Sequence, residues 1–217
     1  MNSAAMTLAF PVSDELRLHL DAFLEAPGEQ VHLVPLLDSF LSDLMAAFFD
    51  GPIQAVGAQG SVATMVQGGV KVISKAARAL IRSLIGKAGP AEREALADHF
   101  RTLALVQGNE LRIRLPMSEA RTTEIQRVFT AYLSGASGYS VQLVAVMREL
   151  CDDALAQYFD ALVACVRLNA FSRGVVATAR KTIQKAAYMA VEKGLPALGR
   201  AHKEPVVRHF DGMLQPA

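Results

Sequence analysis

The feature that most constrains the fold of this chain is an internal repeat. When the sequence is shifted by 110 positions, residues 43–100 lie on residues 153–210 without a gap, and at least fifteen of the 58 pairs are identical. The identical pairs include Asp43/Asp153, Asp50/Asp160, Lys71/Lys181, Ile73/Ile183, Lys75/Lys185, Glu94/Glu204, His99/His209 and Phe100/Phe210. A long fixed period is typical of a repeated supersecondary unit. We therefore predict two related units, residues 1–106 and residues 107–217, in one compact domain.

A short strand is expected at the start of each unit. Upstream of the gapless region the offset falls to 105, so that residues 7–14 lie on residues 112–119. Apolar residues alternate with others in both segments, and this period of two indicates a strand. Pro11 and Pro116 are expected to end each strand or to confine it to a sheet edge. Two such strands can pair about a pseudo-twofold axis as a small two-stranded β element.

Four helices are expected in each unit, because apolar residues recur at steps of three and four. Ser13 and Ser118, each followed by an acidic residue, are expected to cap the first helix. Gly51-Pro52 is expected to end or kink the second helix of the first unit. The predicted fold class is mainly α, with a strand-plus-four-helix unit duplicated in tandem and packed as one pseudo-twofold body. The expected helices lie near residues 14–26, 29–50, 61–85 and 94–100, and near residues 119–133, 140–169, 173–193 and 204–210.

The distribution of charge is uneven, although the formal net charge is only +1. Residues 1–50 carry one Arg and eight acidic residues, whereas residues 51–91 carry five basic residues and no acidic one. Residues 161–217 carry nine basic and three acidic residues. The third helix of each unit is therefore basic, and its lysines, four positions apart, share a face. The candidate anion- or partner-binding residues are Lys71, Lys75, Arg78, Arg82, Lys181 and Lys185.

Two interpretations of these basic helices stay open. They can form a site for phosphate, an anionic lipid headgroup, nucleic acid or an acidic partner. Alternatively they pack against the acidic first and second helices, which is the interpretation that the sequence alone favours. Asp50 and Asp160, which close the second helix, are expected to pair with the lysines across that interface and to serve specificity more than stability.

Three further features have a structural and a functional interpretation. The glycine-rich segment Gly51–Gly69 is expected to allow close helix packing, with insertion into a membrane surface or a partner as the alternative. Its glycines and amides make it a poor transmembrane span. His99 and His209 follow a glutamate by five positions, which is not a standard helical spacing for metal ligands. We expect them to be capping or partly buried histidines beside Phe100 and Phe210.

The cysteines and the N-terminus suggest a reducing compartment. Cys151 and Cys165 are expected about 21 Å apart along one helix, too far for a disulfide. Free thiols suit the cytoplasm, and Met1–Phe10 lacks the basic and apolar regions of a signal peptide. The sequence contains no nucleophile elbow, zinc-protease motif or dinucleotide fingerprint.

The sequence therefore predicts a cytoplasmic, mainly helical binding or interaction protein without catalytic activity, cofactor or metal. It is expected to engage a macromolecular partner, another protein or a second copy of itself, through the basic helices and the glycine-rich segment. The first alternative is a carrier of a lipid or other apolar small molecule, which a large apolar pocket would favour. The second is a nucleic-acid-binding protein, although the near-zero net charge and the lack of aromatics among the basic positions count against it. An enzyme would need catalytic residues assembled from distant positions.

Overall fold

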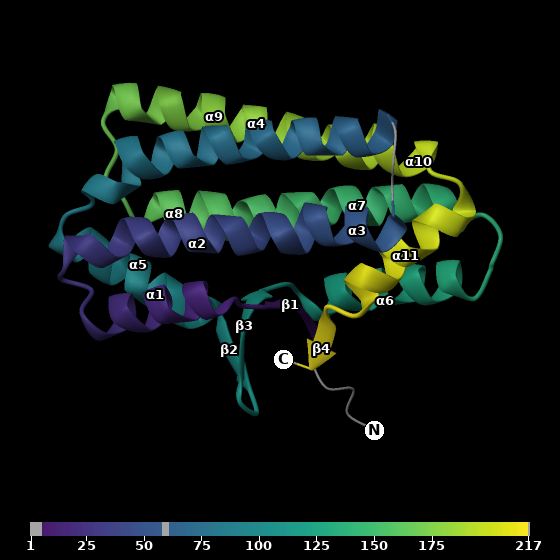
Figure 1. Ribbon diagram of the computed structural model, residues 1–217, viewed down its shortest axis with the longest axis horizontal. Coiled ribbons are helices and arrows are strands. Elements are labelled where there is room, and N and C mark those ends of the chain that lie inside the picture. Colours follow the sequence, from purple (N-terminus) through teal and green to yellow (C-terminus); the bar gives the residue numbers. More distant parts are fainter. Residues whose placement is uncertain (1–5, 58–60, 217) are drawn as a thin grey trace.

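The computed structural model describes residues 6–57 and 61–216, and it is mainly helical, as predicted. Its helices stack in three layers (Figure 1). The outer layer consists of α4 (Ser61–Ser83) and α9 (Ala170–Met189), and the middle layer is built on α2 (Leu33–Met45) and α7 (Tyr139–Leu155). The third layer holds the sheet, flanked by α1 (Asp14–Glu25), α5 (Pro90–Leu103), α6 (Glu119–Leu133) and α11 (Arg200–Asp211).

Short helical segments complete or join these elements. The α-helical ones are α3 (Gly51–Val56), α8 (Ala161–Ala164) and α10 (Leu195–Ala197). The 3-10 turns are η1 (Gln30–His32) and η3 (Ile85–Lys87), and the π turns are η2 (Ala46–Asp50), η4 (Ala156–Asp160) and η5 (Ala190–Gly194). Each middle-layer helix therefore continues through a π turn, α2 through η2 into α3 and α7 through η4 into α8.

The sheet has four antiparallel strands in the order β2-β3-β1-β4, so the prediction of a two-stranded element is wrong in its size. The strands are β1 (Met6–Pro11), β2 (Ala104–Gln107), β3 (Glu110–Leu115) and β4 (Leu214–Pro216). The predicted pairing of β1 with β3 is present, with Phe10 opposite Ile113 and Leu8 opposite Leu115. The outer strands β2 and β4 were missed because segments of four and three residues are too short to show alternation.

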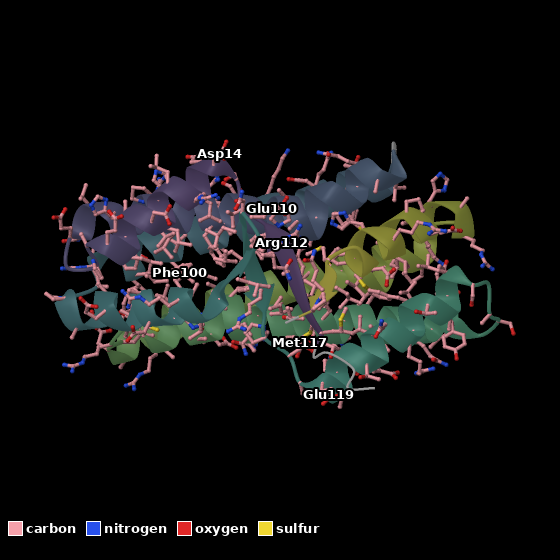
Figure 2. All side chains as sticks on the ribbon, turned by 90° about the horizontal axis from the view of Figure 1, so that it is seen from below. Asp14, Phe100, Glu110, Arg112, Met117 and Glu119 are labelled. Carbon is pink, nitrogen blue, oxygen red and sulfur yellow. The ribbon has the colours of Figure 1, made fainter. Side chains whose placement is uncertain are left out.

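The predicted starts of the first helices are confirmed. The hydroxyls of Ser13 and Ser118 each accept a hydrogen bond from the backbone N–H three residues further on, at 3.1 and 3.3 Å. The acidic residues that follow, Asp14 and Glu119, favour the positive end of the helix dipole. Figure 2, a view from the sheet side, shows these two residues on opposite sides of the strands.

The second helix does not end at Gly51-Pro52, which was one of the two outcomes predicted there. The helix runs on through η2 and α3, and it closes at Gly57, whose φ of 59° lies in the left-handed region that glycine adopts readily. Proline cannot donate to the preceding turn. The π turn accommodates it, because the N–H of Gly51 bonds to the carbonyl of Ala46, five residues back.

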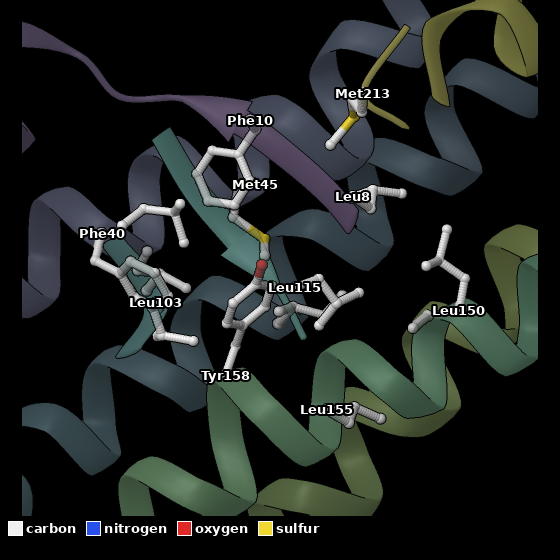
Figure 3. Close-up of a cluster of buried hydrophobic side chains, with 14 of the residues drawn as sticks. Leu8, Phe10, Phe40, Met45, Leu103, Leu115, Leu150, Leu155, Tyr158 and Met213 are labelled. Atoms are coloured by element: carbon white, nitrogen blue, oxygen red, sulfur yellow. The ribbon is translucent and has the colours of Figure 1, made fainter. Parts of the chain in front are cut away.

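The core extends from the sheet through the middle layer to the inner faces of α4 and α9. Leu8 and Phe10 of β1 and Ile113 and Leu115 of β3 are buried on the inner face of the sheet. Aromatic rings pack beneath them edge to face, with centroid distances of 6.2 Å from Phe10 to Tyr158 and 5.6 Å from Phe40 to Tyr158 (Figure 3). Such edge-to-face pairs add to the stability that burial of the rings provides.

One helical run in the described residues, Gln30–Val56, is long and apolar enough to cross a membrane by length and composition. Helices in protein cores meet the same criterion. Here the run includes α2 and lies in the middle layer, where several of its leucines are buried.

Candidate functional site

The basic candidates lie on the outer layer and are exposed. They are Lys71, Lys75, Arg78 and Arg82 on α4, and Lys181 and Lys185 on α9. Ile73 and Ile183, on the opposite faces of the same helices, are buried in the core. Neither helix contains an acidic residue. The two helices therefore present a cationic outer face, which we call the basic layer.

Few of these cations are paired with acids. Arg78 lies 3.8 Å from Asp38 of α2, and Arg180 forms a bidentate pair with Asp160 at 2.7 and 2.8 Å. The expected pairing of Asp160 with a lysine is therefore wrong, because the longer arginine fork of α9 occupies its carboxylate. In residues 6–57 and 61–216 the lysines of the basic layer form no ion pair within 4 Å, so their charge faces solvent.

Apolar side chains are also exposed on the basic layer. Phe171 of α9 is 80% exposed, and Val175 and Met189 of the same helix and Val72 of α4 are partly exposed. An open groove of about 700 Å³ lies between α4 and α9, and its floor is made mostly of small residues such as Ala79. The layer thus combines positive charge with accessible apolar surface.

Three apolar pockets lie beneath the outer layer: pockets B and C lie between it and the middle layer, and pocket A lies beside B among α3, α7, η5, α10 and α11. Pocket A, of about 100 Å³, is bordered by Phe48, Pro52, Met147, Cys151, Val191 and Leu195. Pocket B, of about 100 Å³, is bordered by Met45, Ile73, Ala77, Leu155, Tyr158 and Ile183. Pocket C, of about 60 Å³, is bordered by Leu37, Phe40, Ile81, Ile85, Phe159 and Leu162. No charged side chain lines any of the three.

The three pockets share walls and so form a row. Phe48, Phe49 and Cys151 border both A and B. Tyr158 and Phe159, together with residues of α2 and Ala77, border both B and C. Pocket A is bordered by Leu195 of α10 and pocket C by Leu162 of α8, and these two elements lie toward opposite ends of the molecule (Figure 1).

The two titratable groups in these walls are held neutral by burial. The pKa of the Cys151 thiol is raised to about 12, chiefly by desolvation. Desolvation also raises the pKa of the Tyr158 hydroxyl well above its ordinary value. The Tyr158 oxygen is buried without a hydrogen-bond partner in the described structure, and its ring points into the apolar cluster of Figure 3. The pocket walls therefore offer no charge to a ligand.

His99 and His209 each contact a backbone carbonyl in the other half of the chain. The Nε2 of His99 lies 3.1 Å from the carbonyl of Gln157 in η4, and the Nε2 of His209 lies 2.7 Å from the carbonyl of Ala47 in η2. Both carbonyls belong to π turns. Both contacts need a proton on Nε2, because a carbonyl oxygen only accepts. Desolvation by burial lowers the pKa of His99, against the bond to the carbonyl of Gln157, which raises it. The predicted placement beside a phenylalanine is confirmed, with ring centroids 6.4 Å apart for His99 and Phe100.

The glycine-rich segment does not form one surface. Gly51 lies in a helix against the His209 ring, and Gly69 lies where α4 approaches the carbonyl of Ala186 in α9. Gly60 lies outside the described residues. The segment thus contributes close approaches between helices, which is the packing role that the sequence favoured.

No group of three or more His, Cys, Asp or Glu suited to a metal ion occurs within the described ranges. Both cysteines are free. The chain matches no family model, no curated protein and no solved structure. Its function must therefore be inferred from its own residues.

Proposed function

We propose that this protein is a binding protein without catalytic activity that docks onto an anionic lipid surface through the basic layer. The observation that carries the proposal is a set of exposed cations on two adjacent helices that contain no acidic residue. These cations are Lys71, Lys75, Arg82, Arg173, Lys181 and Lys185. Each basic residue near an anionic membrane contributes about 1 kcal/mol of attraction, so six of them support binding that neither unit would give alone.

The exposed apolar side chains favour a lipid surface over other anionic partners. Phe171, Val175 and Met189 lie on the same helix as two of the lysines. Interfacial helices combine such apolar groups, which enter the headgroup boundary, with basic groups that contact anionic lipids. Nucleic-acid surfaces instead use aromatic side chains among the basic ones, and Phe171 is the one large exposed aromatic residue on the described part of this layer.

We infer that the chain is a tandem duplication whose units pack about a pseudo-twofold axis. The strand register supports this. A shift of 105 positions takes Leu8 to Ile113 and Phe10 to Leu115, so it converts the pair Leu8–Leu115 into the pair Phe10–Ile113. The axis then passes through the pair between them, Ala9–Arg114. The π turns η2 and η4 lie 110 residues apart. A shift of 110 positions also relates the contact of His209 with the carbonyl of Ala47 to that of His99 with the carbonyl of Gln157. Such an axis places the third helix of each unit side by side, which accounts for the two-helix basic layer.

Vesicle co-sedimentation tests the docking proposal. We expect binding to vesicles of phosphatidylcholine with phosphatidylglycerol, and little binding to phosphatidylcholine alone. The variant Lys71→Glu/Lys75→Glu should bind the anionic vesicles more than tenfold more weakly, since two contacts of about 1 kcal/mol each become repulsive. Its melting temperature should stay near that of the native protein, because both lysines are exposed and unpaired in the described structure.

A matched control separates the basic layer from net charge. Arg17→Glu/Arg101→Glu changes the net charge equally, but these exposed arginines lie on α1 and α5 in the third layer. It should bind anionic vesicles almost as the native protein does. Equal loss in both variants would contradict the proposal. A marked drop in melting temperature for the lysine variant would instead support internal packing of the basic helices, and tight oligonucleotide binding without vesicle binding would support the nucleic-acid alternative.

A further inference from the structure

Pockets A, B and C together suggest a second binding activity, independent of the basic layer. We propose that the row is one binding site for a single long, unbranched hydrocarbon chain, such as the acyl chain of an amphiphile. A chain lying in the row would pass between the outer and middle layers, with Cys151 at the wall between A and B and Tyr158 at the wall between B and C.

The length of the row fits a long chain. Met147 borders pocket A and Val163 borders pocket C, and both lie on the helical run from α7 through η4 to α8. Sixteen positions on a helix span about 24 Å. The hydrocarbon depth of one bilayer leaflet, which ordinary membrane acyl chains fill, is about 15 Å. Cys151 and Tyr158, at the two shared walls, lie seven positions apart on this run, which is about 10 Å. A chain of about 15 Å that lies across pocket B therefore passes both walls and enters pockets A and C.

The width and chemistry of the row select the class of ligand. The pockets are narrow, and an apolar cavity of about 150 Å³ holds only one benzene-sized group. A linear series of pockets smaller than this accommodates a chain one methylene wide, whereas a fused ring system needs one broader cavity. Since Cys151 and Tyr158 are neutral and no charged residue lines the row, the polar head of the ligand must stay outside it.

The walls of the pockets correspond to one another in the sequence, which argues that the pockets are not accidental gaps in core packing. Under the offset of 110 residues, Phe48, Pro52 and Met147 of pocket A correspond to Tyr158, Leu162 and Leu37 of pocket C. The walls of pocket B correspond to one another, for example Ile73 with Ile183 and Ala77 with Ala187. Protein cores are packed with few voids larger than a water molecule. Because pockets A and C have corresponding walls, and pocket B is built from walls that correspond to each other, the pockets follow from the structure of each unit.

A chain-length series tests the site directly. Displacement of a dansyl-labelled undecanoate is measured for fatty acids from octanoate to palmitate, below their aggregation limits and without vesicles. Each methylene that enters the row should tighten binding about three- to fourfold, until the chain fills the row. Affinity that does not change with chain length would overturn the proposal.

Small-to-large variants locate the site. Ala190→Leu fills part of pocket A, and Ala77→Leu fills the wall shared by B and C. Each should weaken palmitate binding at least tenfold, whereas Ala177→Leu, on the exposed face of α9, should leave it unchanged. Native affinity in both pocket variants would overturn the proposal.

A measurement on the native protein keeps the test valid if a variant fails to fold. Bound palmitate should raise the melting temperature of the native protein, because a ligand that binds only the folded state stabilises it. Octanoate at the same concentration, which brings fewer methylenes into the row, should raise it less. An unchanged melting temperature with palmitate would count against the site.

Two further experiments distinguish a phospholipid ligand from a free fatty acid, and the hydrocarbon site from the docking surface. Native mass spectrometry after incubation with phosphatidylcholine vesicles that also contain palmitate shows whether the bound chain belongs to a phospholipid or to a free acid. Either bound species supports the site, and neither would count against it. The variant Lys71→Glu/Lys75→Glu should bind palmitate as the native protein does. If the native protein binds palmitate but not anionic vesicles, only the docking proposal fails. If it binds anionic vesicles but not palmitate, only the proposal of a hydrocarbon site fails.

Discussion

At the scale of single residues, Tyr158 is the clearest departure from an ordinary core. It is almost completely buried, and its hydroxyl has no hydrogen-bond partner in the described structure. A buried polar group without a partner costs about 1–3 kcal/mol. The residue 110 positions earlier in the sequence is Phe48, which packs in the same aromatic cluster without a hydroxyl. The sequence shows this pair as a conservative exchange, but it cannot show that the hydroxyl is unsatisfied.

We predict that Tyr158→Phe stabilises the protein. Removal of the hydroxyl leaves the ring contacts in place and should raise the free energy of unfolding by about 1 kcal/mol, measured by urea denaturation. The control is Tyr188→Phe, because the Tyr188 hydroxyl donates to Asp152 and its loss should destabilise. A lower unfolding free energy for Tyr158→Phe would show that the hydroxyl has a partner.

At the scale of helices, two helical glycines, Gly51 of α3 and Gly174 of α9, have opposite effects. A Cβ added to Gly51 would lie 2.5 Å from the His209 ring and 3.1 Å from the carbonyl of Ala46, whereas a Cβ added to Gly174 of α9 would meet no atom within 4 Å. Gly51 is therefore required by the approach of α11 to the π turn η2. Gly174 only weakens its helix, since glycine costs about 1 kcal/mol relative to alanine in a helix interior.

We predict opposite signs for the two Gly→Ala variants. Gly51→Ala should lower the free energy of unfolding by about 1–3 kcal/mol, because overpacking must displace the His209 ring. Gly174→Ala should raise it by about 1 kcal/mol. Thermal unfolding of the two variants beside the native protein measures both. Stabilisation by Gly51→Ala would mean that the ring moves aside without loss of its bond to Ala47.

The same scale shows how far the sequence predicts this fold. The helix-capping serines Ser13 and Ser118 and the β1–β3 pairing follow from local patterns, because each signal lies within a few residues. The continuation of the second helix through Pro52 does not follow from a local pattern, because it depends on a π turn that no residue type marks. The basic candidates could be identified by charge and spacing. The pocket walls could not, because Cys151 and Tyr158 come into contact with α3 and α4 only through packing.

At the scale of the whole molecule, the two proposed units, residues 1–106 and 107–217, pack into each other. β1 lies between β3 and β4, and α3 packs against α11. His99 and His209 bond across the boundary in both directions. Each unit alone would expose its half of the aromatic cluster to water, and burial of about 25 cal/mol per Å² of apolar surface is the main force that holds such units together.

We therefore predict that neither unit folds alone. Cleavage within the β2–β3 turn, at Gly108, gives fragments 1–108 and 109–217 without cutting a strand. Each fragment by itself should show low helical circular dichroism and no cooperative melting as a monomer, because half of its core partners are absent. Equimolar mixing should restore the helical signal and give a one-to-one complex by native mass spectrometry. A monomeric fragment with a cooperative transition would place a complete core within one unit, and the basic layer would then join two separate bodies instead of covering one.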